Sequence, residues 1–100
     1  GRRMGEFALA GLRRLQAKYP VIGDVRGIGL MLGVELLRPG AWERMTQAAE
    51  QVLYAALRRG LSFKLTMGNI LTLTPALTIT EDEMNEALRI LDACFAELGN

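Results

Sequence analysis

The chain has 100 residues, the size of one ordinary domain, with half of them apolar and 23% charged. Its formal net charge of +1 predicts no basic surface for nucleic acid or an anionic membrane. The absence of histidine excludes Ser-His and Cys-His nucleophile pairs and zinc sites built on histidine. No apolar run approaches the roughly 20 residues that span a bilayer. The single cysteine, Cys94, fits a reducing compartment such as the cytoplasm.

The first predicted element is a helix from Met4 to Lys18. Its apolar residues recur at helical spacing, and the Tyr19-Pro20 pair ends it because the residue before a proline avoids helical geometry. The chain starts within this pattern, at Gly1-Arg2-Arg3, without an obvious cap. Such a start is expected of a chain cut from a longer polypeptide.

The glycine-rich stretch 21–36 is too often interrupted for a helix and predicts two strands. They are placed at about Gly23–Arg26 and Leu30–Leu36, joined by a tight Gly27-Ile28-Gly29 turn. A nucleotide-binding loop is the competing interpretation. A dinucleotide fingerprint needs three glycines at fixed spacing before a helix, whereas here Gly33 is displaced by one position and a strand follows. Turn geometry is therefore favoured.

The middle of the chain predicts a turn, a helix and a hairpin. The turn is Arg38-Pro39-Gly40, and helical spacing continues over Ala41–Arg59. Two short apolar runs follow, Leu61–Leu65 and Ile70–Thr74, separated by a turn that contains Gly68-Asn69.

The last segment has the clearest local pattern. Thr80 followed by Glu83 predicts a capping box, in which each side chain binds the other residue's backbone N–H. A continuous apolar face follows up to Leu98, and Gly99 supplies a stop. The order of helix, two strands, helix, two strands, helix predicts one α+β domain over residues 1–100. We expect a small, mostly antiparallel sheet covered by helices on one side.

Two residues could act as nucleophiles. A buried Lys64 could form a Schiff base, but a lysine that reaches solvent from a strand is far commoner. Cys94 lies on the apolar face of the last helix, so a core thiol is favoured over a reactive one.

Several charged or aromatic residues have plain structural interpretations. Asp24 and Arg26 share a strand face, where we expect them to pair or to contact a neighbouring domain. Asp92 and Glu97 are assigned to the solvated side of the last helix, and Trp42 to a packing anchor at the start of the middle helix. The residues themselves therefore indicate an α+β domain with no self-contained active site.

Three stretches share letters and spacing with one known family. Residues 24–36 follow its D-V-R-G-x-G-L-M-x-G-x-E-L run, residues 60–68 match its hairpin, and residues 69–80 are similar to its segment around P-P-L. Together they resemble the C-terminal small domain of class III pyridoxal-phosphate-dependent aminotransferases, a part of fold-type I enzymes.

The resemblance implies a division of labour between two domains. A large upstream domain would bind pyridoxal 5'-phosphate and supply the lysine that holds it, and the small domain would pack over the site in a homodimer. The reaction would transfer an amino group from an amine or amino acid to a 2-oxo acid. Neither Lys18 nor Lys64 matches the cofactor lysine, so the resemblance implies no catalytic residue here, and the chain alone is expected to be inactive.

The chain departs from the family at Thr72, where many members have an arginine that grips a substrate carboxylate. Thr72 is therefore the candidate substrate-binding residue, at a place expected to lack a fixed positive charge. Ala76 also replaces the second proline of P-P-L. Three alternatives stay open: an ordinary strand threonine with the clamp elsewhere, a lyase of the family that acts on an amino-phosphonate or amino-phosphate, and a non-catalytic regulatory or interaction module.

Overall fold

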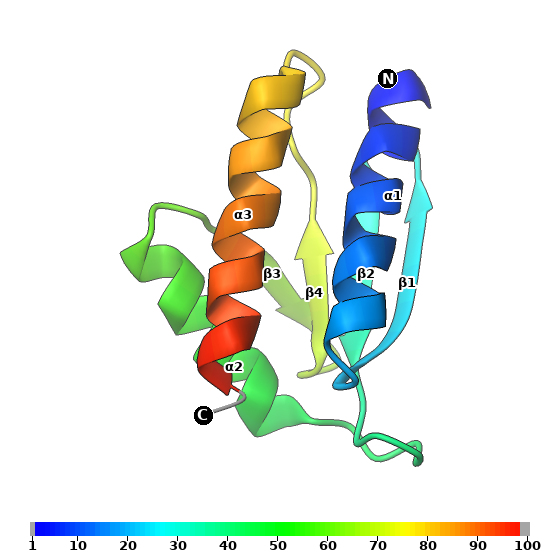
Figure 1. Ribbon diagram of the computed structural model, residues 1–100, viewed down its shortest axis with the longest axis vertical. Coiled ribbons are helices and arrows are strands. Elements are labelled where there is room, and N and C mark those ends of the chain that lie inside the picture. Colours follow the sequence, from blue (N-terminus) through cyan, green and yellow to red (C-terminus); the bar gives the residue numbers. More distant parts are fainter. Residues whose placement is uncertain (1, 99–100) are drawn as a thin grey trace.

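A computed structural model describes residues 2–98 of the chain, so the predicted stop at Gly99 and the start at Gly1 lie outside the described residues. Three helices and four strands make up the fold (Figure 1). In chain order the elements are α1 (Arg2–Lys18), β1 (Ile22–Ile28), β2 (Met31–Leu36), α2 (Thr46–Arg58), β3 (Lys64–Thr66), β4 (Ile70–Leu73) and α3 (Glu81–Leu98).

The strands form one antiparallel sheet in the order β1-β2-β4-β3. Two hairpins, β1–β2 and β3–β4, meet through the pairing of β2 with β4. Helices α1 and α3 lie side by side over one face of the sheet, and α2 packs against α3 at its C-terminal end (Figure 1). Within the described residues no helix covers the other face. The predicted α+β class, with helices on one side of the sheet, is confirmed.

Strand β2 shows how the sequence sorts side chains between the two faces. Leu32, Val34 and Leu36 are buried against the helices, whereas Met31 is exposed and Glu35 half-buried on the other face. This alternation follows from the two-residue repeat of a strand. Residues from all three helices complete the core. Those buried are Ala8, Leu12, Leu15, Ala49, Val52, Ala55, Ala56, Met84, Ile90, Leu91, Cys94 and Phe95.

The first hairpin is tighter than predicted. Strand β1 continues through Gly27 to Ile28, and the turn falls at Gly29 and Leu30. Gly29 has a φ of 58°, the left-handed region that glycine enters without strain. A close approach of α1 also needs small residues, because a Cβ on Gly5 would lie 2.8 Å from the carbonyl carbon of Gly29. The glycines therefore serve turn geometry and close packing, as expected, and no helix follows them.

Helix α2 begins at Thr46 and not at Ala41, which corrects the predicted boundary. Backbone bonds hold the preceding segment in a loop, including one from the N–H of Arg38 to the carbonyl oxygen of Glu43 at 2.9 Å. The two side chains add a bidentate ion pair, with distances of 3.0 and 3.2 Å. Trp42 lies in this loop with 88% of its surface exposed, so the prediction of a packing anchor is wrong within this chain.

The first strand of the second hairpin begins later in the chain than the predicted run Leu61–Leu65. Strand β3 covers only Lys64–Thr66. Leu61 is held at the end of α2 instead, because its N–H donates to the carbonyl oxygen of Ala56. The turn consists of Met67, Gly68 and Asn69, and the first two of these have positive φ. Asn69 then anchors β4, since its buried side-chain amide donates to the carbonyl oxygen of Leu36 at 3.0 Å.

The capping box at the start of α3 is confirmed. The N–H of Thr80 donates to a carboxylate oxygen of Glu83 at 2.9 Å, and the N–H of Glu83 donates to the hydroxyl oxygen of Thr80 at 3.1 Å. Two backbone donors at the helix start are thereby satisfied.

The solvated side of α3 carries interactions that the sequence did not predict. The hydroxyl of Tyr19 donates to the half-buried carboxylate of Asp92, and Lys18 lies 3.1 Å from the same group. The Tyr19 hydrogen bond is the main reason that the pKa of Asp92 is lowered. Glu97 pairs with Arg58, the last residue of α2, and with Arg59 just after it. The prediction that these two acids are merely solvated is therefore wrong: they join α3 to α1 and α2.

Candidate functional site

The uncovered face of the sheet, here called the open face, carries most of the polar side chains of the strands. One row of residues crosses it from strand to strand through direct cross-strand partners. The register pairs Arg26 with Gly33, Gly33 with Thr72, and Thr72 with Lys64. The row therefore has a cation at each end and two small residues between them.

In the β1–β2 half of the row, the positive charge of Arg26 is compensated by carboxylates. Arg26 binds Asp24, as predicted, and also Glu35 at 3.2 Å. The hydrogen bond to Asp24, followed by that to Glu35, raises the pKa of Arg26. Two carboxylates thus neutralise this guanidinium, which leaves it little capacity for a further anion.

The β3–β4 half of the row contains Thr72 and Lys64 and no carboxylate. Thr72 is half-buried, and its hydroxyl lies 2.7 Å from the hydroxyl of Thr66, so that either group can be the donor. Lys64 is exposed, as expected, on the strand beside it. Directly opposed residues on one sheet face have Cβ atoms about 4.5–5.5 Å apart. The register therefore places Lys64 directly across from Thr72 on the same face of the sheet.

A cavity of about 390 Å³ opens next to this pair, where β3 and β4 separate. Its size falls in the range of small-molecule sites. Its polar lining residues are Ser62, Lys64, Thr72 and Thr74, and the rest are apolar. The apolar lining residues are Leu32, Leu61, Phe63, Leu73, Pro75, Ile79, Met84 and Ala87.

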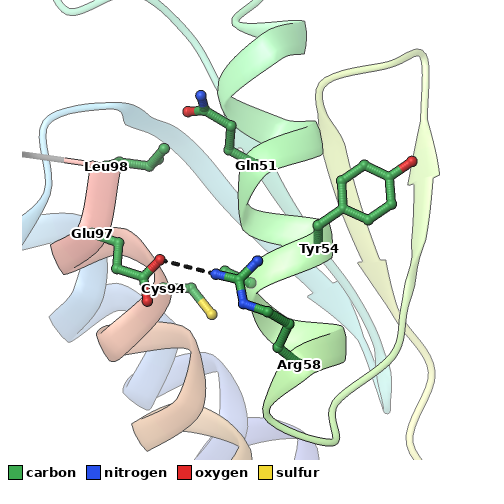
Figure 2. A pocket seen from close by; sticks show the side chains of 7 residues that line it. Gln51, Tyr54, Arg58, Cys94, Glu97 and Leu98 are labelled. Carbon is green, nitrogen blue, oxygen red and sulfur yellow. Dashed lines mark hydrogen bonds and ion pairs between the residues drawn. The ribbon is translucent and has the colours of Figure 1, made fainter.

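A second cavity, of about 420 Å³, lies between α2 and α3 (Figure 2). It contains Cys94, whose side chain is buried as predicted, and an ion pair of 3.2 Å between Arg58 and Glu97. Burial raises the pKa of the Cys94 thiol, which disfavours the reactive thiolate. The cavity therefore has the chemistry of a helix–helix contact and not of a nucleophilic site.

The two lysines of the described residues lie in different surroundings. Lys18 is engaged with Asp92 at the helical layer, and Lys64 is exposed at the sheet edge. Residues 2–98 also contain no cluster of side chains suited to a metal ion, and none of their helices has the length and hydropathy needed to cross a membrane.

Comparison with known proteins gives the family. The model of class III aminotransferases matches residues 1–95. The chain belongs to the class III aminotransferase family. Among solved structures, an aminotransferase from Bacillus anthracis superposes with a TM-score of 0.88 and 30% identity, over 96% of this chain and 23% of that one.

Two relatives of this chain are named for different activities. (R)-1-hydroxy-2-aminoethylphosphonate ammonia-lyase from Vibrio splendidus is 42% identical over 92% of this chain and 19% of its own length. 5-aminovalerate aminotransferase from Pseudomonas putida is 40% identical over 96% of this chain and 23% of its own length. The chain thus spans about a fifth of the length of these relatives.

The sequence indicated Thr72 but not its neighbour across the strands. Lys64 and Thr72 are eight positions apart, and only the register of the hairpin brings them together. The turn at Gly68-Asn69 was a usable signal. Counting outward from a three-residue turn centred on Gly68 pairs residue 66 with 70 and residue 64 with 72.

Proposed function

We propose that this chain is the small domain of a pyridoxal-phosphate-dependent class III aminotransferase. The family match over residues 1–95 carries the proposal. The open face adds support, because an uncovered sheet with a half-buried Thr72 and a neighbouring cavity suits a domain that closes over a substrate. The reaction is the transfer of an amino group from an amine or amino acid to a 2-oxo acid.

The cofactor belongs to another part of the polypeptide in this proposal. When bound there, its pyridinium ring supplies the electron sink for the chemistry at the amino carbon. This chain contributes Thr72 at the substrate. It contributes no catalytic residue, so the 100-residue chain alone is inactive and forms no stoichiometric imine with pyridoxal phosphate. Borohydride trapping followed by mass spectrometry tests this, and a trapped adduct at Lys64 that supports turnover would contradict it.

A second candidate is a lyase of the same family that acts on an amino-phosphonate or amino-phosphate. One relative named for such an activity shares 42% identity with this chain. Threonine in place of arginine at position 72 also favours such a lyase, because the planar guanidinium that matches a carboxylate is missing there.

One experiment separates these functions. The full-length polypeptide that carries this chain is loaded with pyridoxal phosphate and incubated with a panel of amines, amino acids and amino-phosphonates, with and without pyruvate. An aminotransferase forms alanine only with pyruvate, whereas a lyase releases ammonia without it. A polypeptide that binds no pyridoxal phosphate and converts none of these compounds would favour the non-catalytic module.

The assembly and location follow the family expectation. We propose a cytoplasmic homodimer in which the small domain packs on the large domain of the same polypeptide. Light scattering of the full-length protein at micromolar concentration checks the dimer, and a monomer under those conditions would remove this part of the proposal.

A further inference from the structure

Lys64 is the uncompensated cation of the open face. Among residues 2–98, the structure places no carboxylate within ion-pair distance of its ammonium group, while Arg26 at the other end of the row has two. An exposed lysine without a partner is common on protein surfaces. Lys64 differs from such a lysine because it lines a cavity together with three residues that carry hydroxyls, Ser62, Thr72 and Thr74.

The polar residues that line the cavity with Lys64 all carry hydrogen-bond donors. The ammonium group has three donors that rotate freely, and the hydroxyls of Ser62 and Thr74 can turn toward it. Thr72 is available too, because when Thr66 donates to it the Thr72 hydroxyl hydrogen remains free. Gly33, on the far side of Thr72, has no side chain to obstruct the approach.

We propose that Lys64 binds a tetrahedral oxyanion of the substrate, such as a phosphonate, phosphate ester or sulfonate, with help from the hydroxyls of Ser62, Thr72 and Thr74. This inference rests on the proposed function, since it assigns the substrate class of the same site. A point charge surrounded by rotatable hydroxyls suits a tetrahedral group, which accepts hydrogen bonds in several directions. A planar carboxylate is better matched by the bidentate fork of arginine, which this place lacks.

The test uses the full-length protein with pyridoxal phosphate bound and three variants. Lys64→Met removes the charge, Lys64→Arg keeps it, and Lys18→Met makes the same change at the chain's other lysine, in the helical layer. Conversion of 2-aminoethylphosphonate is compared with that of 1-aminobutane, which has no anionic group. Binding of methylphosphonate is followed separately by ³¹P nuclear magnetic resonance, which requires no turnover.

Lys64→Met is expected to raise the KM for 2-aminoethylphosphonate and the Kd for methylphosphonate about 10- to 100-fold, the range for a hydrogen bond to a charged group. Lys64→Met changes the KM for 1-aminobutane much less than the KM for 2-aminoethylphosphonate. Lys64→Arg retains most of the phosphonate affinity, and Lys18→Met behaves like the wild type. Unchanged methylphosphonate binding in a folded Lys64→Met variant overturns the inference. A wild type that binds methylphosphonate through Lys64 but converts no amine would instead contradict the proposed function alone.

Discussion

The two faces of the sheet differ although the same strands build both. Leu71 and Thr72 are consecutive in β4, yet Leu71 is 0% exposed beneath the helices while Thr72 lies on the open face beside Lys64. On β2, Val34 and Glu35 show the same contrast. The alternation of a strand thus separates two tasks: one set of positions holds the fold together, and the other is free to meet a ligand. Substitutions at neighbouring positions should therefore have unlike effects.

The largest expected effect is on the covered face. Leu71→Ala removes a fully buried side chain and should lower the free energy of unfolding by about 2–5 kcal/mol. Thr72→Val keeps the shape of the threonine side chain and should cost less than about 1 kcal/mol, because the position is only half-buried. Urea unfolding of both variants measures the difference. Similar losses would show that the two faces do not divide stability in this way.

The next effect concerns the approach of α1 to the first hairpin. Gly5→Ala places a methyl group against the backbone of Gly29, which cannot turn aside, and should cost about 1–3 kcal/mol despite the better helix propensity of alanine. Gly11→Ala is the matched control, since its methyl group meets only the flexible end of Leu88. Thermal melting compares the two. A Gly5→Ala variant at least as stable as Gly11→Ala would mean that α1 lies farther from the hairpin.

A smaller effect is expected at the start of α3. Thr80→Ala removes the hydroxyl that accepts the N–H of Glu83 and should cost about 1 kcal/mol. Thr78→Ala, in the exposed turn just before, should leave the urea midpoint unchanged. Equal midpoints for the two variants would show that the capping box contributes nothing measurable.

The smallest effect is the dependence of stability on pH through Asp92. The Tyr19 hydrogen bond lowers the pKa of Asp92 in the folded chain, so its stabilising contribution is fully present above the ordinary value near 3.9. It is lost as the pH falls through the lowered pKa. Since 37% of this side chain is exposed, the contribution should stay below about 1 kcal/mol. The urea midpoint should fall less between pH 6 and pH 2.5 in Asp92→Asn than in the wild type. An equal fall in both proteins would contradict this.

Local patterns predicted most of the fold. Helical spacing placed α1 and α3, the capping box placed the start of α3 at its residue, and glycines placed both hairpins within a few residues. The start of α2 was missed, because an ion pair and backbone bonds across the loop between Arg38 and Glu43 outweigh the helical propensity of the intervening residues. Asp92 was missed because its partner Tyr19 is 73 positions away, and no local pattern reports such a contact.

The candidate site divides in the same way between local and distant information. Thr72 was found because a single position departs from a family pattern, and the Asp24–Arg26 pair because its members lie two residues apart on one strand. The row that joins Arg26 through Gly33 and Thr72 to Lys64 depends on the register of four strands. Pairing of β2 with β4 across more than 30 residues cannot be read from the spacing of residues within either strand.

The most direct test of the open face as a substrate surface is the ratio of kcat/KM for an α-amino acid to kcat/KM for an ω-amine, measured in the full-length protein and in Thr72→Arg. Arginine at this position adds a carboxylate clamp to the face, and a hydrogen bond between charged groups contributes about 1.5–3 kcal/mol. We expect this ratio to rise about 10-fold or more in favour of the α-amino acid. An unchanged ratio in a folded Thr72→Arg variant would contradict it, because position 72 would then not contact the substrate.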